Sequence, residues 1–390
     1  MATARDPLDE SFADIRDGVR RLCAEFPGEY WRRHDRERAY PRTFVEALTK
    51  AGFLAALIPE SYGGSGLGVR EAAAIMEEIH RSGCNGGACH AQMYTMGTIL
   101  RHGSDAQKRA YLPAIAGGEL RLQAFGVTEP TSGTDTLDLR TTAERDGEAY
   151  VVNGQKVWTS RAEHSDLMLL LARTTPKDRA EKRTLGLSVF IVDMRKALGN
   201  GLTVKPIRTM INHSTTEVFF DDLRIPASSL VGEQDRGLYY ILDGMNVERI
   251  LIASEAIGDA RWFIDKAAGY ARERRVFARP IGQNQGIQFP IAQAYAETEA
   301  AALMVERAAG LFDGGEPCGA EANMAKLLAA DAAWHAGDMC MQTFGGFGFA
   351  EEYDIERKFR ETRLFRTAPI STNMILAYLG EHVLGLPRSY

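Results

Sequence analysis

The feature that most constrains this chain is a long proline-free segment that predicts a single helix. From Leu238 to about Val276 apolar residues recur at the spacing of one helical face. The stripe consists of Ile250, Ala253, Ile257, Ala260, Ile264, Ala267 and Ala271. Further helices are expected at about 289–312 and 319–342. The segment 236–390 is therefore predicted to be a helical bundle.

The remaining sequence divides into a helical part and a β-rich part. The segment 1–120 predicts helices at Pro41–Ala51, Val69–Arg81 and Asp105–Ile115, with glycine clusters between them. From about residue 121 short β-rich runs alternate with turns; examples are Tyr150–Val152, Leu167–Leu171 and Leu187–Val192. We therefore expect a small, largely antiparallel β-domain at 121–235 between the two helical domains.

Composition and charge exclude several classes of function. The 390 residues, 45% of them hydrophobic, suffice for a large core and for more than one domain. The net charge of −6 gives no indication of binding to nucleic acid or to an anionic membrane surface. No segment approaches the roughly 18 apolar residues of a membrane span. The acidic N-terminus has no apolar h-region, so we expect no secretory signal. A cytoplasmic enzyme is the simplest expectation.

The cysteines do not predict a metal site. There are five, irregularly spaced, and no two form a CxxC pair. Cys84, Cys89 and His90 lie close together in the sequence, but no fourth ligand is apparent. We expect reduced thiols and no bound metal.

The predicted β-domain opens with residues suited to a flat, polar ligand. Gly126 and Gly133 would let the backbone approach such a ligand closely. Val127, Thr128 and Thr134 offer N–H and hydroxyl donors for carbonyl oxygens. From these residues alone, a surface loop rich in turn formers explains the segment equally well.

Two further segments allow a cofactor as well as a purely structural role. Trp158, beside the hydroxyl residues Thr159 and Ser160, could stack on a cofactor ring or be buried in a β-core. Gly345 and Gly346 follow a predicted helix and either permit a close pass by a ligand or only end the helix.

Together these segments resemble the acyl-CoA dehydrogenase family. Residues 126–135 match the family's first signature, except that Asp138 stands where a small residue is usual. The second signature is matched by Gln342, Gly345, Gly346, Gly348, Phe349, Glu352, Arg357 and Glu361. Tyr353 is an exception, where proline is common. The two signatures occur in the right order, and the likeness covers nearly the whole chain.

The resemblance implies an α+β fold with an N-terminal helical domain, a middle β-barrel-like domain and a C-terminal four-helix bundle. It also implies FAD as the cofactor, an acyl-CoA as the substrate and an electron-transfer flavoprotein-like acceptor. Members of the family usually assemble as homotetramers.

The resemblance also implies the cofactor and substrate residues. The residues implied at the flavin are Phe125, Val127, Thr128, Gly133, Thr134, Trp158 and Ser160. Those implied at the pyrophosphate or adenosine of a neighbouring subunit's FAD are Arg274, Phe277, Gln285, Gln342, Gly345 and Gly346. A guanidinium suits a pyrophosphate because bidentate charge-assisted bonds are strong, although a solvated basic helix end also explains Arg274. Thr134 is further implied at the substrate, and His90–Met96 along the acyl cavity.

The catalytic base departs from the commonest family pattern. Where many members have a glutamate, this chain has Pro369, but the isovaleryl-type and long-chain branches carry the base just before an arginine on the long helix. That position is Glu248, followed by Arg249. The resemblance places Arg249 near the CoA and Asn246 at a CoA contact. An exposed glutamate paired with a nearby arginine is the structural alternative.

Pro369 has a second consequence, because proline has no backbone N–H. In the family the N–H at that position helps hold the thioester carbonyl. Ser371 and Asn373, assigned to the cofactor site, are candidates to replace this donor, as is the Ile370 N–H.

Two other functions remain open at this point. One is a flavin monooxygenase or oxidase on the same fold, against which the Glu248–Arg249 pair argues. The other is a flavoprotein subunit that has lost catalysis, which only Pro369 favours.

Overall fold

The computed structural model describes residues 12–388, which form two compact units. The helical unit contains the described part of Met1–Ala39 together with Gly68–Gly86 and Asn246–Tyr390. The sheet unit contains Tyr40–Leu67 and Gly87–Met245. Each unit therefore combines segments that are far apart in the sequence. The domain boundaries predicted at residues 120 and 235 stay a prediction, because the two compact units are made of interleaved segments and not of consecutive domains.

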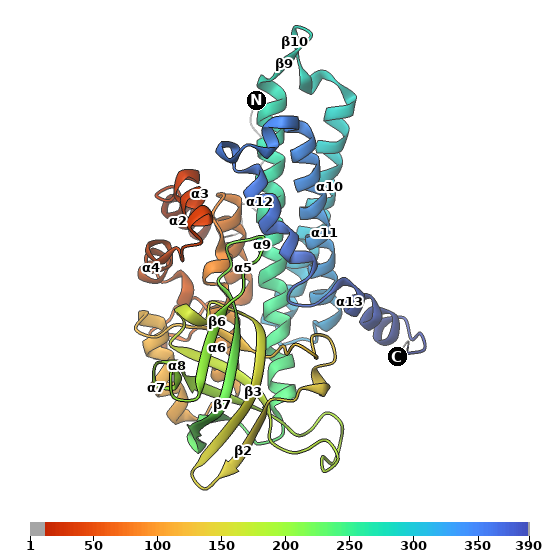
Figure 1. Cartoon of the computed structure of the whole chain (residues 1–390). Helices are drawn as coiled ribbons and strands as arrows, with labels where there is room; N and C mark the ends of the chain where they lie inside the picture. Colours follow the sequence, from red (N-terminus) through yellow and green to blue (C-terminus); the bar gives the residue numbers. More distant parts are fainter. Residues whose placement is uncertain (1–11, 389–390) are drawn as a thin grey trace. The chain divides into compact units, whose positions relative to one another are not determined.

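Three long helices, lying side by side in Figure 1, dominate the helical unit. They are α9 (Gly237–Glu273, of which 246–273 belong to this unit), α10 (Gln285–Asp313) and α11 (Gly319–Phe344). Every residue of the predicted α9 stripe is buried, so the expected long helix and its two partners are confirmed. The shorter helices of this unit are α2 (Ala13–Cys23), α3 (Gly28–Glu37), α5 (Val69–Arg81), α12 (Ile355–Thr362) and α13 (Thr372–Tyr378).

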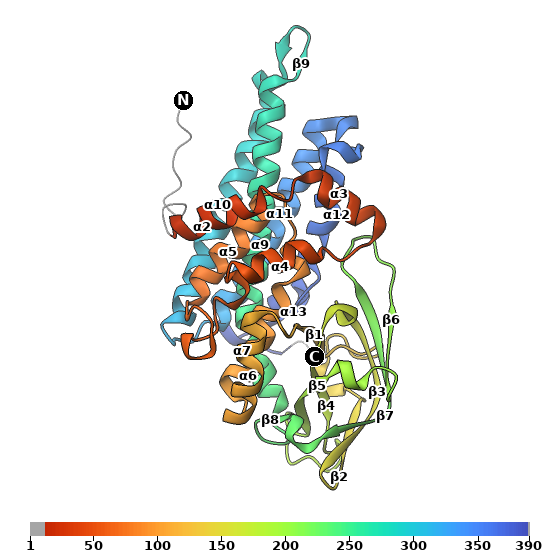
Figure 2. The ribbon, with the colours of Figure 1, turned by 90° about the vertical axis from the view of Figure 1, so that its left-hand side faces the viewer.

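The long helix ends earlier than predicted. It stops at Glu273, and β9 (Arg275–Val276) then pairs with β10 (Arg279–Pro280) in a hairpin at the end of the helices (Figure 2). The two residues between these strands, Phe277 and Ala278, both have positive φ, of 51° and 63°. Two-residue hairpins favour this geometry. Asparagine and glycine usually adopt this geometry. The sequence Phe-Ala therefore does not predict a turn.

The sheet unit is built on an eight-stranded mixed sheet with the order β6-β7-β3-β2-β4-β5-β8, while β1 pairs with β4. The pairs β1–β4 and β2–β4 are parallel and the others antiparallel. The strands are β1 (Leu122–Gly126), β2 (Thr142–Asp146), β3 (Ala149–Ser160), β4 (Leu167–Arg173), β5 (Leu187–Asp193), β6 (Leu202–Pro206), β7 (Thr215–Pro226) and β8 (Leu230–Val231). The predicted fold, with helical ends and a β middle, is confirmed.

Strand β4 pairs with three neighbours, β1, β2 and β5. Leu167, Leu169 and Leu171 pack into a core on one face, whereas Met168 and Leu170 pack into a second core on the other. Because successive side chains of a strand point to opposite faces, a strand with cores on both sides must be apolar throughout.

The first of these two cores is shared with helices of the same unit. They are α6 (His90–His102) and α7 (Asp105–Gly117). The unit also contains α4 (Arg42–Lys50), which contributes no residue to this core, and the short α8 (Met194–Ala197), which follows β5. Predicted helices thus appear as α4, α5 and α7. Helix α6 gave no periodic signal because its first ten residues are all buried, whichever way they face.

Charged side chains are buried against the middle of α9 in the helical unit. Asp259 accepts hydrogen bonds from His80 Nδ1 (2.8 Å) and Thr362 Oγ1 (2.6 Å) and pairs with Lys358. Burial alone would raise the pKa of Asp259, but Lys358 and His80 lower it to about 2. Since His80 Nε2 accepts the Gly86 N–H (2.9 Å), the ring proton lies on Nδ1.

The partners of this aspartate lead to a first prediction. Replacing Lys358 by Met removes the cation and leaves Asp259 buried with neutral partners. Breaking a buried ion pair on one side typically costs about 3–5 kcal/mol, and urea unfolding should show a loss of this size. Lys182→Met, on an exposed loop, should change stability by less than about 0.5 kcal/mol. Equal, small losses in both variants would show that the folded state does not depend on this pair.

Candidate active site

A buried ion pair fixes the start of the predicted flavin segment within the sheet unit. Lys156 Nζ donates to Glu129 Oε1 (2.8 Å) and to the Val127 carbonyl (3.0 Å). Glu129 also accepts the N–H groups of Arg140 (2.7 Å) and Thr141 (2.9 Å). The loop after β1 is therefore tied to the middle of β3, so that Val127 and Thr128 are held beside that strand.

The electrostatics of this pair agree with its geometry. Burial would raise the pKa of Glu129, but Lys156 and the two backbone donors hold it below its usual value. Burial lowers the pKa of Lys156 to about 8, and Glu129 opposes that shift. Sequence reasoning missed both residues, because a glutamate and a lysine well separated in the chain look like ordinary surface charges.

Trp158 is presented on the surface of the sheet unit. Trp158 is 58% exposed, and its backbone has a φ of 61°. The register of β3 against β7 shifts between Lys156 and Thr159, and such a bulge redirects a side chain from the regular alternation. The alternative of a tryptophan buried in the β-core is therefore wrong.

The other predicted flavin residues lie at the ends of β1 and β3 and in the loop that follows β1. Phe125, Val127 and Thr128 are half-buried, at the end of β1 and just beyond it, and the Val157 N–H donates to the Thr128 carbonyl (2.9 Å). Gly133 and Thr134 are exposed in the loop that follows, and Ser160 is half-buried at the end of β3.

The two glycines of this segment have different roles. An added Cβ at Gly126 would lie 3.1 Å from Met168 Sδ and 3.3 Å from Leu170, so this glycine fits closely against β4. An added Cβ at Gly133 would approach only Thr128, at 4.0 Å. The explanation by close approach of a ligand therefore holds only for Gly133, since packing within the sheet already accounts for Gly126.

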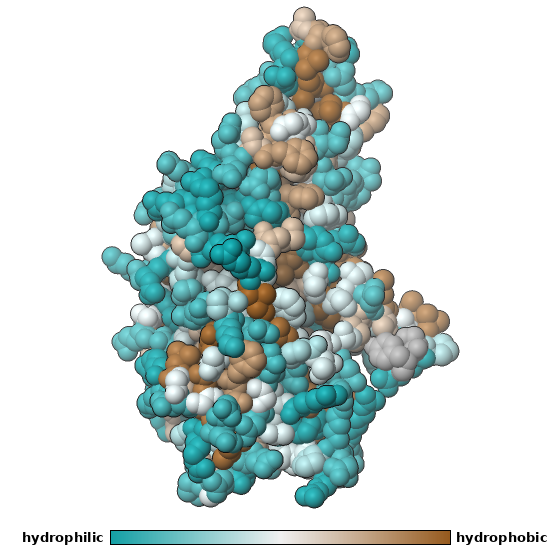
Figure 3. All heavy atoms as spheres, in the orientation of Figure 1, coloured by the Kyte–Doolittle hydropathy of each residue, from teal (hydrophilic) through white to brown (hydrophobic). Residues whose placement is uncertain are grey.

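A depression of about 780 Å³ lies at the hairpin end of the helical unit. It brings together five of the predicted nucleotide residues: Arg274, Phe277, Gln342, Gly345 and Gly346. Gln285, at the exposed start of α10, is not among the lining residues, whereas Asn284 is. Figure 3 shows apolar surface at this end of the unit, where Phe277 is 96% exposed.

Aromatic rings shape the floor of this depression, and sequence reasoning missed them. Tyr270 stacks on Phe344 with the ring centroids 4.1 Å apart. The Arg274 guanidinium lies over the Phe347 ring, 5.6 Å from its centroid, in a cation–π contact that holds the cation at the rim. The residues therefore offer a cation, backbone of two glycines and apolar surface to one ligand.

The predicted base lies in the helical unit, near the start of its part of α9. Glu248 and Arg249 are buried, with exposed fractions of 7% and 8%. The alternative of an exposed surface glutamate is therefore wrong. Arg249 donates to Asn246 Oδ1 (2.9 Å) one turn earlier, and burial lowers the pKa of Arg249, although Glu248 opposes that shift.

The loop with Pro369 is anchored from α11. Lys326, also buried, donates from Nζ to the Ile370 carbonyl (2.7 Å). The Ser371 hydroxyl accepts from the Met374 N–H (3.4 Å) and caps α13, while Asn373 is exposed on that helix. Ser371 thus already has a structural role.

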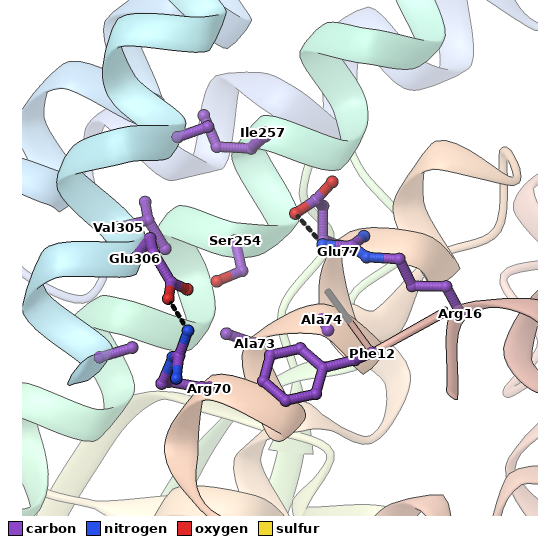
Figure 4. A pocket seen from close by; sticks show the side chains of 12 residues that line it. Phe12, Arg16, Arg70, Ala73, Ala74, Glu77, Ser254, Ile257, Val305 and Glu306 are labelled. Atoms are coloured by element: carbon purple, nitrogen blue, oxygen red, sulfur yellow. Dashed lines mark hydrogen bonds and ion pairs between the residues drawn. The ribbon is translucent and has the colours of Figure 1, made fainter. Parts of the chain in front are cut away.

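A second cavity is too small to bind a substrate. It lies in the helical unit among α2, α5, α9 and α10 and has a volume of about 30 Å³ (Figure 4). Its walls include the ion pairs Arg16–Glu77 and Arg70–Glu306. This space suits about one water molecule. Within residues 12–388, no group of three or more His, Cys, Asp or Glu could hold a metal ion, and no helix could cross a membrane.

The comparison with protein families accounts for nearly the whole chain. Residues 9–119, 124–223 and 235–384 match the acyl-CoA dehydrogenase N-terminal, middle and C-terminal domains. The chain belongs to the acyl-CoA dehydrogenase family.

Individual relatives agree with this assignment. Acyl-CoA dehydrogenase FadE12 of Mycobacterium tuberculosis is 36% identical over 379 residues, which cover 96% of each chain. Human mitochondrial short-chain specific acyl-CoA dehydrogenase is 33% identical over 362 residues, which cover 91% of this chain and 85% of the human protein. Among solved structures, the glutaryl-coenzyme A dehydrogenase glutaryl-CoA complex superposes with a TM-score of 0.90 at 28% identity, over all of this chain and 98% of that one.

The family depends on FAD, and the residues of this acyl-CoA dehydrogenase fit such a cofactor. The sheet unit offers an exposed indole beside a loop held rigidly by the Glu129–Lys156 pair. The helical unit offers a cation and open glycine backbone in one depression. These are the donor types that a flavin ring and a pyrophosphate require.

The Glu129–Lys156 pair leads to a second prediction. Lys156→Met leaves a carboxylate buried without its cation, which should cost about 3–5 kcal/mol of stability. Because the loop after β1 is then released, the purified enzyme should also contain less flavin. Lys205→Met on the exposed β6 provides the control. Unchanged flavin content and stability in Lys156→Met would show that the pair does not hold this loop.

Proposed function

We propose that this enzyme introduces a double bond between the α and β carbons of an acyl-CoA thioester, with Glu248 as the base that removes the α proton. The observation that carries the proposal is a glutamate buried on α9 directly before a buried arginine. A carboxylate in water is a weak base, and burial is what makes it stronger. Bound FAD would supply the acceptor for the hydride from the β carbon.

Two other buried carboxylates of the helical unit, Glu77 and Asp259, are less suited to this role. Glu77 accepts hydrogen bonds from Arg16 (3.1 Å) and Arg261 (2.7 Å), and these cations hold its pKa low against the effect of burial. Asp259 is held ionised by Lys358 and His80. Carboxylates bound so firmly to cations are poor proton acceptors.

Arg249 and Asn246 are proposed to bind the CoA part of the substrate. Their hydrogen bond fixes the guanidinium along α9 next to Glu248. Because Arg249 is largely desolvated, an anionic or carbonyl group of the substrate would gain more from it than from an exposed arginine.

We propose that FAD is shared between subunits of a homotetramer. The flavin would contact Phe125, Val127, Thr128, Gly133, Thr134, Trp158 and Ser160. The pyrophosphate or adenosine end would contact Arg274, Phe277, Gln285, Gln342, Gly345 and Gly346. Arg274, just beyond the end of α9, lies about 39 Å along the helix axis from Glu248 at 1.5 Å per residue, so it is well placed to serve a neighbouring subunit's cofactor. An electron-transfer flavoprotein-like protein would reoxidise the flavin.

Pro369 removes one backbone donor from the place where the family holds the thioester carbonyl. Ser371 and Asn373 remain candidates near the cofactor, and the Ile370 N–H is the nearest backbone donor after Pro369. Lys326 fixes the carbonyl of Ile370, so this part of the loop is held in one position.

A third prediction concerns the cofactor. Flavin released from the enzyme should be FAD, because the depression in the helical unit is needed only by the adenosine-diphosphate half. Arg274→Ala should weaken FAD binding by about 1.5–3 kcal/mol, the range of a hydrogen bond to a charged group. Arg272→Ala changes an exposed arginine at the end of α9 that does not line the depression, and this variant should bind FAD normally. Release of FMN, or equal affinity in both variants, would contradict the assignment.

A fourth prediction tests the base. Glu248→Gln keeps the shape of the side chain and removes its basicity, so that anaerobic flavin reduction by acyl-CoA should fall by about 10²–10⁴-fold. FAD content should stay normal, and Glu273→Gln at the exposed end of α9 should reduce its flavin at the ordinary rate. Full activity of Glu248→Gln would assign the base to another residue.

A further inference from the structure

Two cysteine thiols contact each other inside the helical unit. Cys23 is the last residue of α2, and Cys84 follows the turn after α5. Both are reduced, with exposed fractions of 2% and 0%. The Cys23 thiol donates a hydrogen bond to the Cys84 sulfur, and Cys84 Sγ lies 3.8 Å from the Cys23 carbonyl oxygen. The proposed dehydrogenation uses neither of these residues.

The two thiols lie between helices that other contacts hold together. Helix α2 packs against α5 (Figure 2), and Arg16 of α2 donates to Glu77 of α5 (3.1 Å). One turn later Arg20 donates to Glu78 (2.9 Å). A disulfide needs its sulfurs about 2.05 Å apart. Thiols that already share a hydrogen bond reach this distance by small shifts at the two helix ends.

The surroundings of Cys84 favour its thiolate. Burial would raise the pKa of Cys84, but hydrogen bonds from Cys23 and Trp31 lower it. The cations of Lys358 and Arg357 lower this pKa further, and both donate to backbone carbonyls of the turn after α5, at 3.2 Å each. Because a thiolate and not a thiol attacks an oxidant, Cys84 is the reactive member of the pair.

Cys23 has the complementary property. Its hydrogen bond to Cys84 and its burial raise the pKa of Cys23, and the Glu78 carboxylate acts in the same direction. Cys84 therefore ionises first, while Cys23 keeps its proton until Cys84 has reacted. Reversible oxidation of a cysteine typically uses such a second thiol to resolve the first product.

We propose that Cys23 and Cys84 form a reversible disulfide when the protein meets a hydroperoxide, and that this bond locks α2 to α5. The Cys84 thiolate attacks one peroxide oxygen and the O–O bond breaks, which gives a sulfenic acid at Cys84 and an alcohol. The Cys23 sulfur then attacks the Cys84 sulfur, and the hydroxyl leaves with the Cys23 proton as water. Two thiols are thus oxidised to a disulfide while one hydroperoxide is reduced.

Burial determines both the oxidant and the effect of the bond. A small hydroperoxide can reach the fully buried Cys84 through local opening of the helix ends, whereas a bulky thiol reagent requires more extensive unfolding. The bond would join positions that are 61 residues apart. Because such a cross-link restricts the unfolded chain, oxidation should stabilise the folded protein.

The test is peptide mapping of the full-length protein after oxidation in its native state. The protein is treated with a small excess of hydrogen peroxide, free thiols are alkylated in denaturant, and the digest is analysed by mass spectrometry without reduction. We expect a linked pair of peptides that contain Cys23 and Cys84 and that dithiothreitol separates again. Cys340 is equally buried and should stay free for alkylation, because burial raises its pKa to about 12.

Three variants separate the two thiols from cysteine oxidation in general. Cys23→Ala should stop at a sulfenic acid on Cys84, which dimedone captures, whereas Cys84→Ala should leave Cys23 unoxidised. Cys340→Ala changes a thiol at the same depth outside the pair and should form the bond like the wild type. Oxidation should raise Tm by several degrees in the wild type and in Cys340→Ala, but not in Cys23→Ala.

Every outcome decides the inference. A linked Cys23–Cys84 pair together with a reversible rise in Tm supports it. The inference is overturned if no linked pair forms in the native protein, if linkage needs urea, if Cys84 pairs with another cysteine, or if oxidation lowers Tm. Since no acyl-CoA enters the measurement, neither result bears on the proposed dehydrogenation.

Discussion

The helical unit depends on charged side chains buried along the middle of α9. Asp259 is enclosed by His80, Lys358 and Thr362, while Arg261 connects Glu77 on α5 to Glu299 on α10. Removing one member leaves an uncompensated buried charge, which is far more costly than losing an apolar contact. These contacts hold α5, α10 and α12 against α9 in one arrangement, and that helix carries Glu248 near one end and Arg274 just beyond the other.

Much of the fold could be predicted because periodicity is strong where an element has one buried face. The α9 stripe, α5 and the antiparallel strands all show it. Helix α6 does not, since it is buried on every side. The β9–β10 hairpin was missed because Phe277 and Ala278 adopt a turn geometry that their residue types do not favour.

The sequence predicted which residues belong to the candidate site but not the contacts that hold them in place. The resemblance to the family identified Thr128, Trp158 and Gln342, but what positions them comes from contacts between distant residues. Lys156 and Glu129 are separated by a whole loop and the strand β2, and Tyr270 and Phe344 belong to different helices. Neither pair has a local pattern. The burial of Glu248 is likewise a property of tertiary packing.

The interleaved make-up of the two units also determines the order in which they can form during synthesis. The sheet unit is complete once Met245 has been added, whereas the helical unit needs residues from both ends of the chain. Glu77 is made early, but its partner Arg261 follows 184 positions later. Domains generally fold as units while the ribosome is still elongating the chain. The N-terminal helices can pair Glu77 with Arg16 as soon as both are made, but they lack its second partner, Arg261, until α9 emerges. A chain truncated before α9 would therefore leave Glu77 with one cation instead of two.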